Sequence, residues 1–352
     1  MQQKQFISIL AGLAIVLILG IGGLVRFSTI ENPAHWGESM GTTYSVKISG
    51  KVKRSLLKQI KQRIDGRLAE INAQMSTWEP DSEISSFNRS RSVQAFPCSE
   101  AFASVVERAL QLAESTEGAF DPTLQPLLNL WGFGSGGEQP AIPSDDEVAA
   151  ARKKTGWRKL TSRNWAIEKA EPEISLDLGA IAKGYGVDAL ARILEQAGLE
   201  NWFVEIGGEV VVKGLNPDGM PWKIGIQFPT TNPMEDGRLQ GIVHMTNGAV
   251  ATSGDYRNYI EEDGVIYSHI LDPRSGRAVR SNTASVTVVA PDCMDADGIA
   301  TALFVMGADA GLAWVEDQPQ VEALFLLRGE NGEINEKFSS GFRKASGYTS
   351  SL

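Results

Sequence analysis

Histidine and cysteine are scarce in this chain of 352 residues, which limits the metal chemistry open to it. Only three histidines are present, at His35, His244 and His269, so a multi-histidine metal centre is disfavoured. The two cysteines, Cys98 and Cys293, lie too far apart in sequence for a zinc or CxxC motif. They could form a disulfide only if the fold brought them together.

Several common catalytic motifs are also missing. The sequence has no Walker lysine motif, no HExxH and no G-x-S-x-G nucleophile elbow. Gly132, Gly134 and Gly137 match G-x-G-x-x-G, the dinucleotide fingerprint. That motif works only where it follows a strand and opens a helix, whereas Pro140 and Pro143 follow here. The pattern therefore argues against a Rossmann domain.

Positive charge is in deficit. Thirty-three basic residues face 43 acidic ones, which gives a formal net charge of -10 at pH 7. Such a surface repels phosphodiester backbones, so we expect no nucleic-acid partner. With 42% apolar and 22% charged residues, the composition is that of an ordinary folded protein and excludes the collagenous and disordered classes.

One long hydrophobic run is present, at residues 6–25. It consists of 19 apolar or glycine residues and one serine, Ser8, between Lys4 and Arg26, long enough to cross about 30 Å of hydrocarbon as a helix. No small-residue cleavage pattern follows it, which favours an uncleaved anchor over a signal peptide. We expect residues 1–27 to be a single-pass anchor or signal segment in a bacterial inner membrane. Residues 28–352 would then form one catalytic domain in the periplasm.

The body of the chain alternates helical and extended patterns. Apolar residues recur every three or four positions over 52–75, which predicts an amphipathic helix. A second helix is expected between Ser99 and Gly118, a third after the capping box of Ser144 and Glu147, and a fourth from 179 to 198. Strands are expected within 201–214, 221–228, 241–247, 264–272, 284–290 and 321–329. Short connections favour antiparallel pairing, so the fold class is α+β.

Two polar clusters stand at expected helix starts. In SLDLGAIAKGYGVD, Asp177 and Lys183 occupy a strand-to-helix junction, where unpaired backbone groups can meet a phosphate or a metal. In DADGIATALFVMG, Asp297 and Thr301 are four residues apart, so both oxygens project from one helix face and suit Mg²⁺. The simpler alternatives are a plain helix start in the first cluster, and helix capping by Asp295 or Asp297 in the second. We expect the Asp297 carboxylate to be exposed.

Other clusters are turn-rich and aromatic. SHILDPRSG ends an expected strand with His269, Asp272 and Arg274, and the histidine is either catalytic or structural. Trp78 and Phe120, taken alone, are more typical of core or lid residues than of groups that stack on a ligand.

Together these clusters resemble the ApbE family of flavin transferases, which attach FMN, taken from FAD, to a threonine or serine of a target protein through a phosphoester bond. The resemblance runs from MGTTYSV at Met40 through MSTWEPDSEISSFN, GAFDPT, LDLGAIAKGYGVD, EIGGEV, ATSGDY and HILDPRSG to DADGIATALFVMG near Gly307. It implies an α+β domain with FAD as substrate and Mg²⁺ bound between its elements.

The resemblance also implies roles for single positions. The residues expected to hold FAD are Met40, Trp78, Ala119, Phe120, Asp121, Asp177, Lys183 and Ile270. The expected Mg²⁺ ligands are the Ala180 carbonyl, the Asp297 carboxylate and the Thr301 hydroxyl. His269 is the candidate general base because its ordinary pKa lies near 6.5, and Asp255 and Asp295 are weaker candidates.

The resemblance suggests acceptor flavoproteins in membrane respiratory complexes, of the sodium-pumping or electron-bifurcating (Rnf) type. Many family members are lipoproteins, whereas this chain has no lipobox cysteine at the apolar run, and we expect a transmembrane anchor in its place. Two alternatives stay open at this stage: a pyrophosphatase that cuts FAD to FMN and AMP, and a periplasmic flavin-binding protein without turnover.

Overall fold

The structure is a computed structural model that describes residues 28–136, 139–230, 232, 237–256, 258–262 and 265–351. No helix in these residues combines the length and the apolar character needed to cross a membrane. The apolar run at residues 6–25, and with it the expected anchor, lies outside the described residues.

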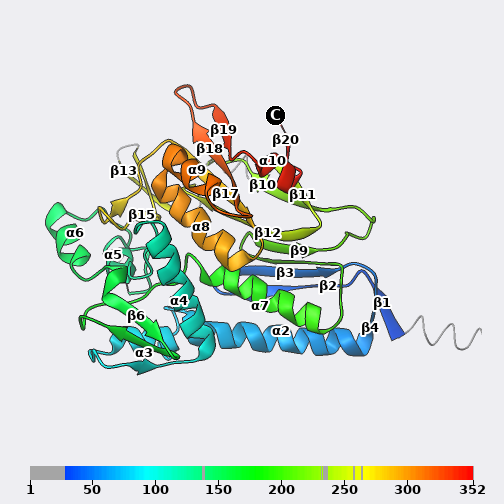
Figure 1. Cartoon of the computed structure of the whole chain (residues 1–352), viewed down its shortest axis with the longest axis horizontal. Helices are drawn as coiled ribbons and strands as arrows, with labels where there is room; N and C mark the ends of the chain where they lie inside the picture. The colour runs from blue at the N-terminus through cyan, green and yellow to red at the C-terminus, as the bar shows by residue number, and fades with distance from the viewer. Residues whose placement is uncertain are drawn as a thin grey trace, which may run out of the picture.

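An eight-stranded antiparallel sheet forms the centre of the molecule, in the order β19-β18-β17-β12-β9-β8-β3-β2 (Figure 1). Its strands are β2 (Ala34–Ser39), β3 (Thr42–Ile48), β8 (Trp202–Ile206), β9 (Glu209–Lys213), β12 (Asn247–Gly254), β17 (Thr283–Ala290), β18 (Glu322–Arg328) and β19 (Ile334–Phe338). Every strand pairing in the described part of the chain is antiparallel, as the short connections predict. The α+β class is confirmed.

Helices cover one face of this sheet. They are α2 (Arg54–Met75), α4 (Glu100–Ser115), α7 (Ala182–Gln196), α8 (Cys293–Met306) and α9 (Ala308–Glu316). In Figure 1, α7 lies between α2 and the sheet, and α8 crosses beside it. The largest hydrophobic core lies in this layer. It places the first turns of α7 and α8 against each other.

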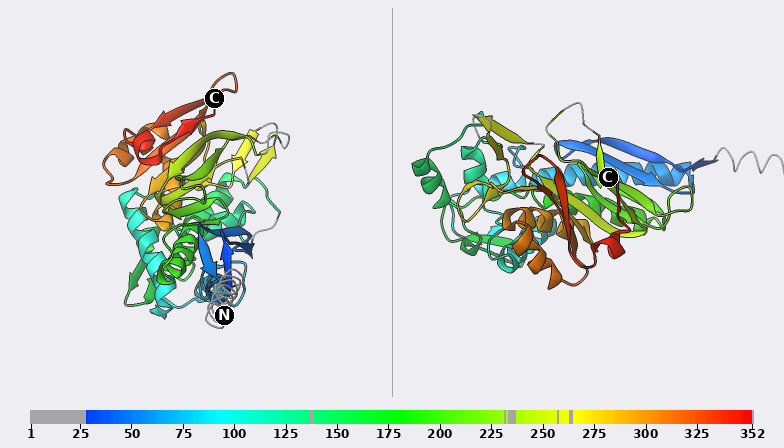
Figure 2. Two further views of the ribbon diagram at one scale, coloured as in Figure 1. Left: turned by 90° about the vertical axis from the view of Figure 1, so that its right-hand side faces the viewer. Right: turned by 90° about the horizontal axis from the view of Figure 1, so that it is seen from above.

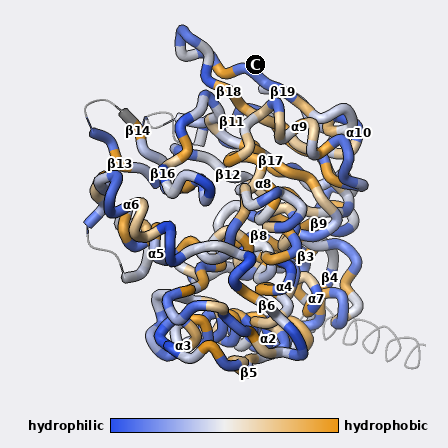
Figure 3. Tube along the Cα trace, turned by 60° about the vertical axis from the view of Figure 1, so that its left-hand side comes forward, coloured by the Kyte–Doolittle hydropathy of each residue, from blue (hydrophilic) through white to orange (hydrophobic). Residues whose placement is uncertain are grey.

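The opposite face packs on a second, three-stranded sheet of β10 (Trp222–Gln227), β11 (Leu239–Met245) and β20 (Thr349–Ser350), with α10 (Phe342–Ser346) beside it. Strand β9 shows the consequence of two covered faces. Val211 points into the helical core, whereas Val210 and Val212 point into the second core. Burial on both sides explains why β17 is buried at every position and is largely apolar in Figure 3.

The remaining elements build the part of the molecule farthest from β1 (Thr29–Glu31) and β4 (Lys51–Lys53), at the left of Figure 1. They are α3 (Glu83–Arg89), α5 (Gln125–Leu130), α6 (Asp145–Arg152), the short 3-10 helix η1 (Trp157–Lys159), β5 (Phe96–Pro97), β6 (Leu160–Arg163) and β7 (Ala166–Lys169). Two small hairpins join them: β13 (Tyr259–Glu262) with β14 (Val265–Ser268), and β15 (Leu271–Asp272) with β16 (Arg277–Ala278).

Local predictions of helix ends are confirmed in detail. The Ser99 side chain caps α4, and Gly118 ends that region with a φ of 80° and an N–H bond to the Ala113 carbonyl. The capping box of Ser144 and Glu147 starts α6. The two cysteines are free thiols.

Candidate active site

The two polar clusters predicted at helix starts meet where α7 packs on α8. Asp297 is 3% exposed, and its Oδ2 accepts a hydrogen bond of 2.9 Å from the Gly184 backbone N–H. Its Oδ1 lies 3.3 Å from Lys183 Nζ. The expectation of an exposed carboxylate was therefore wrong: Asp297 lies on the face of α8 that turns toward α7. Capping by Asp295 or Asp297 was wrong too, because the Asp292 side chain caps α8.

Close approach of the two helices depends on a small residue and a buried acid. A Cβ on Gly184 would lie 2.2 Å from the Cys293 carbonyl oxygen and 2.8 Å from Asp297 Cβ, so only glycine fits there. One turn further on, the buried Asp188 carboxylate accepts N–H bonds of 2.9 Å from both Cys293 and Met294. These bonds satisfy N–H groups that the first turn of α8 would otherwise leave without partners.

Lys183 also contacts a second buried carboxylate, that of Glu209, which was not among the residues predicted from the sequence. Glu209 begins β9 directly after the Gly207–Gly208 turn, is 4% exposed, and holds Oε1 at 3.2 Å from Lys183 Nζ. Its Oε2 has no hydrogen-bond partner in the described part of the chain. The only signal in the sequence was an acid after Gly-Gly in EIGGEV.

Burial and neighbouring charges shift the pKa values of Lys183 and Glu209 in opposite directions. Burial raises the pKa of Glu209, and the Lys183 ammonium opposes that rise. For Lys183, burial lowers the pKa, but the two carboxylates outweigh burial and leave the pKa above its ordinary value. Lys183 is therefore cationic at neutral pH, and the site holds one fixed positive charge between two acids.

Thr301 follows Asp297 by four residues on α8, so the two oxygens lie on one helix face as the spacing predicts. Thr301 Oγ1 lies 3.0 Å from Ser253 Oγ, which comes from β12 and the ATSGDY motif. This contact places the hydroxyl at the boundary of α8 and the central sheet.

The third expected metal ligand, Ala180, is half-buried just before α7. The next residue, Ile181, packs beside Gly298, which follows Asp297 on α8. The segment that carries the Ala180 carbonyl thus lies against the same turn of α8 as the carboxylate. The structure brings together the two stretches of chain that the metal prediction requires.

The residues present fit a hard divalent cation. Their donors are a carboxylate, a hydroxyl and a backbone carbonyl, the oxygen types that Mg²⁺ prefers. Each Asp297 oxygen accepts one bond and keeps a lone pair. No group of three His, Cys, Asp or Glu side chains in the described residues is arranged as a metal site, and the predicted set contains only one carboxylate.

Two of the loops predicted to bind FAD lie side by side. The Asp177 N–H donates a 2.8 Å bond to the Pro122 carbonyl, which joins LDLGA to GAFDPT. Asp177 Oδ1 accepts from the Gly179 N–H at 2.8 Å, and burial raises the pKa of Asp177. The Asp121 carboxylate accepts three bonds, from the Thr123 N–H and hydroxyl and from the Trp157 N–H. It holds the loop in shape.

The other predicted FAD contacts differ in exposure. Ala119 and Phe120 are 1% and 3% exposed, so their side chains belong to the core, one of the two settings expected for Phe120. Trp78, by contrast, is 71% exposed in the loop after α2 and is not a core residue. Met40 occupies the β2–β3 turn with a φ of 54° and packs against Gly186 of α7.

His269 and Ile270 lie between β14 and β15. His269 Nδ1 is 2.9 Å from the Asn258 carbonyl, which can only accept, so Nδ1 carries the proton and Nε2 keeps a lone pair. Burial lowers the pKa of His269; the bond to Asn258 opposes this shift, and the positive charge of Lys183 adds to it. The ring is therefore a neutral proton acceptor at pH 7. Ile270 is 6% exposed.

The rival bases are engaged elsewhere. Asp255 forms two 2.7 Å bonds with Arg328. Asp295 binds Arg108 through both oxygens. Both carboxylates are occupied by a guanidinium on both oxygens, whereas His269 Nε2 keeps its lone pair, so the geometry favours His269 over both.

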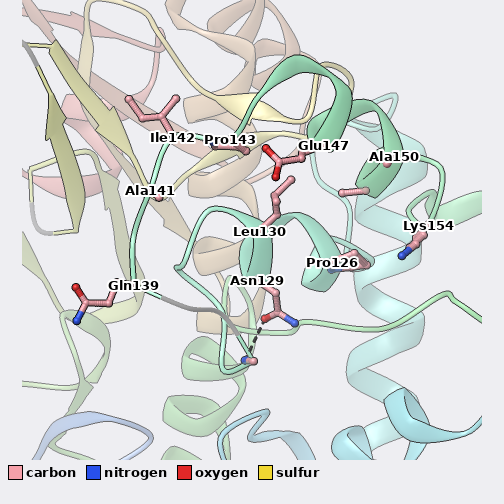
Figure 4. A pocket seen from close by; sticks show the side chains of 12 residues that line it. Pro126, Asn129, Leu130, Gln139, Ala141, Ile142, Pro143, Glu147, Ala150 and Lys154 are labelled. Atoms are coloured by element: carbon pink, nitrogen blue, oxygen red, sulfur yellow. Dashed lines mark hydrogen bonds between the residues drawn. The ribbon is translucent and has the colours of Figure 1, made fainter.

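A separate pocket of about 650 Å³ lies between α5 and α6 (Figure 4). Pro126, Leu130, Ile142 and Lys154 are among the residues that line it, and Asn129 bonds the Gly136 N–H at its rim. None of the predicted site residues lines this pocket.

Comparison with known proteins agrees with this arrangement. The model of the ApbE family matches residues 40–325. An FAD:protein FMN transferase of Vibrio cholerae is 42% identical over 330 residues, covering 93% of this chain and 97% of the relative. One of Haemophilus influenzae is 39% identical over 315 residues, covering 88% of this chain and 90% of the relative.

Solved structures give the same answer. The flavin transferase ApbE of Vibrio cholerae aligns with a TM-score of 0.81 at 42% identity, over 89% of this chain and 99% of that one. The apo flavinyl transferase ApbE of Pseudomonas stutzeri aligns with a TM-score of 0.80 at 36% identity, over 91% and 98%. With the family model matching most of its length and relatives this similar, the chain belongs to the ApbE family.

Proposed function

We propose that this protein transfers the FMN part of FAD to a serine or threonine hydroxyl of an acceptor protein. Membership of the ApbE family supports this activity. The observation that carries it is the convergence of Asp297, Lys183 and Thr301 at the junction of α7, α8 and the central sheet. Such a junction offers oxygen ligands for a cation and a fixed positive charge for a diphosphate.

In the proposed reaction, the acceptor hydroxyl oxygen attacks the phosphorus on the riboflavin side of the FAD diphosphate. An oxygen–phosphorus bond to the acceptor forms, the bond from that phosphorus to the bridging oxygen breaks, and AMP leaves. The hydroxyl proton passes to His269 Nε2, the ring nitrogen that keeps its lone pair. The products are a phosphoester-linked FMN and AMP.

Asp297, Thr301 and the Ala180 carbonyl would hold Mg²⁺, which when bound offsets charge on the phosphate oxygens. Lys183 contributes positive charge from the protein itself, held in place by Glu209. With Mg²⁺ bound, the charges of the ion and of Lys183 would outweigh those of the Asp297 and Glu209 carboxylates, so an acidic chain would present a locally cationic site to an anionic substrate.

The test uses the full chain in detergent with FAD, Mg²⁺ and a peptide that carries the acceptor threonine. We expect the peptide to gain the mass of one FMN while AMP is released. Asp297→Ala should remove this gain, whereas Asp309→Ala, which removes an exposed carboxylate paired with Lys337, should keep it. Free FMN without peptide modification would instead identify a pyrophosphatase, and unchanged FAD would identify a binding protein.

We further propose that residues 6–25 anchor the protein in a bacterial inner membrane, with the catalytic domain in the periplasm and acceptors in respiratory complexes there. The support is the length and apolar character of that run. Membrane fractions washed with alkaline carbonate should retain the protein, and protease added to spheroplasts should degrade it. Release by carbonate would contradict the anchor, and protection from the protease would contradict the orientation.

A further inference from the structure

One segment of this acidic protein has the opposite charge. Between residues 39 and 64 the sequence contains seven lysines and arginines and no aspartate or glutamate, although the whole chain has a net charge of -10. Five lysines there are exposed, and we name the last four of them the basic collar: Lys51, Lys53, Lys58 and Lys61. The first two lie on β4 and the others on the first two turns of α2.

The collar adjoins the start of the described chain. Strand β4 pairs with β1, with Lys53 opposite Thr29 and Lys51 opposite Glu31. Only three residues separate Thr29 from Val25, where the apolar run ends. In Figure 1, β1, β4 and the start of α2 form one end of the long axis, and the left panel of Figure 2 looks onto that end.

The positive charge of the collar is little neutralised by the protein. No collar lysine takes part in an ion pair within the described residues. Glu31 is the one acid in β1. A positively charged surface is thus left for a partner of opposite charge.

We propose that the basic collar rests on the anionic phospholipid headgroups of the membrane that holds residues 6–25. This inference depends on the proposed membrane anchor. The anchor confines the collar to the surface at a high effective concentration, so individually weak lysine contacts suffice. Basic side chains beside a membrane segment are drawn to anionic lipids in this way. Acidic proteins would also attract the collar, and the experiment below distinguishes them from lipid.

The contact would fix how the candidate site stands over the membrane. Helix α2 has 22 residues, or about 33 Å at 1.5 Å per residue, and runs from the collar to Met75. Trp78 follows its far end, and the Asn72 side chain there bonds Ser39 next to Met40. With the collar on the headgroups, these predicted FAD contacts would face acceptors that project into the periplasm by roughly the length of α2.

The experiment places the full chain in vesicles and measures how near the collar lies to the headgroups. A fluorescent dye is attached at Gln62→Cys, beside the collar, or at Glu330→Cys in the β18–β19 turn, both in a Cys98→Ser background. Vesicles contain a headgroup quencher in phosphatidylcholine alone or mixed with phosphatidylglycerol. We expect the quenching at residue 62 to rise with phosphatidylglycerol and fall with added salt, and that at residue 330 to stay low.

A matched pair of charge reversals tests the lysines themselves. Each lysine at an anionic surface favours contact by roughly fivefold. The double variant Lys58→Glu with Lys61→Glu should therefore lower the quenching at residue 62 to its phosphatidylcholine value. Lys153→Glu with Lys154→Glu, an equal change of charge at the end of α6, should leave it unchanged.

Equal quenching in the two kinds of vesicle would overturn the proposal. The proposal would also be overturned if the double variant Lys58→Glu with Lys61→Glu kept its quenching but had a higher KM for an acceptor protein in detergent. The collar would then bind the acceptor. FMN transfer to the acceptor peptide in detergent is measured in parallel. If the unaltered chain showed no FMN transfer, the proposed activity would be refuted. If the unaltered chain were recovered in the soluble fraction, the anchor would be refuted.

Discussion

Asp188 offers the sharpest test of how the candidate site is assembled. Its buried carboxylate crosses from α7 to accept N–H bonds from Cys293 and Met294, at 2.9 Å each, in the first turn of α8. Asp297 lies one turn further along the same helix. Asp188→Ala would leave both N–H groups without an acceptor, so we expect α8 to loosen and the geometry around Asp297 to degrade.

The magnitude follows from the two lost bonds. A buried donor left without a partner costs about 1–3 kcal/mol. We therefore expect Asp188→Ala to lower the free energy of unfolding by about 3 kcal/mol. Burial raises the pKa of Asp188 to about 6 despite the backbone bonds that oppose it, so folding disfavours the charge, and the stabilisation comes from the acceptor oxygens. Asp188→Asn keeps an oxygen acceptor and should cost about 1 kcal/mol.

The assay is guanidinium-induced unfolding of the full chain in non-ionic detergent, together with the rate of FMN transfer. Asp292→Ala is the matched control, because it removes the side-chain cap of the same helix, which accepts from the Asp295 N–H at 3.0 Å. That change should cost about 1 kcal/mol. If Asp188→Ala costs no more than Asp292→Ala, the link between α7 and α8 does not hold the site as argued.

Three further predictions concern the same junction. Gly184→Ala should destabilise the fold by about 1–3 kcal/mol and slow FMN transfer, because the added Cβ would collide with α8. In the same unfolding assay, Gly66→Ala on the open surface of α2 should be neutral or stabilising. Asp297→Ala should abolish transfer and, by leaving the Gly184 N–H unpaired, cost about 1–3 kcal/mol; normal activity would reject the metal site. Because the pKa of His269 is lowered, its neutral form persists below pH 6.5, and the transfer rate should fall only as pH drops through that lowered pKa. The contribution of His269 to the free energy of unfolding is complete above its ordinary pKa and is lost as the pH falls through the lowered pKa. If the pH profile of transfer in His269→Gln were identical to that of the unaltered protein, His269 would have no part in the mechanism.

The amino-acid sequence alone determined the features that depend on neighbouring residues. The periodic apolar positions of 52–75 gave α2, and the capping box of Ser144 and Glu147 gave the start of α6. The spacing of Asp297 and Thr301 placed both on one helix face. Each of these follows from the helical repeat or from local hydrogen bonds, which act within a few residues.

Only the tertiary structure decided which distant groups share the site. Asp297 was expected at the surface, but packing against Gly184 buries it. Glu209 joined the site because a Gly-Gly turn directs β9 past Lys183, and Asp188 joined α8 across 105 positions of sequence. Contacts of this kind depend on how the helices and the sheet pack. A local sequence pattern does not identify the distant residue that packing brings next to a side chain.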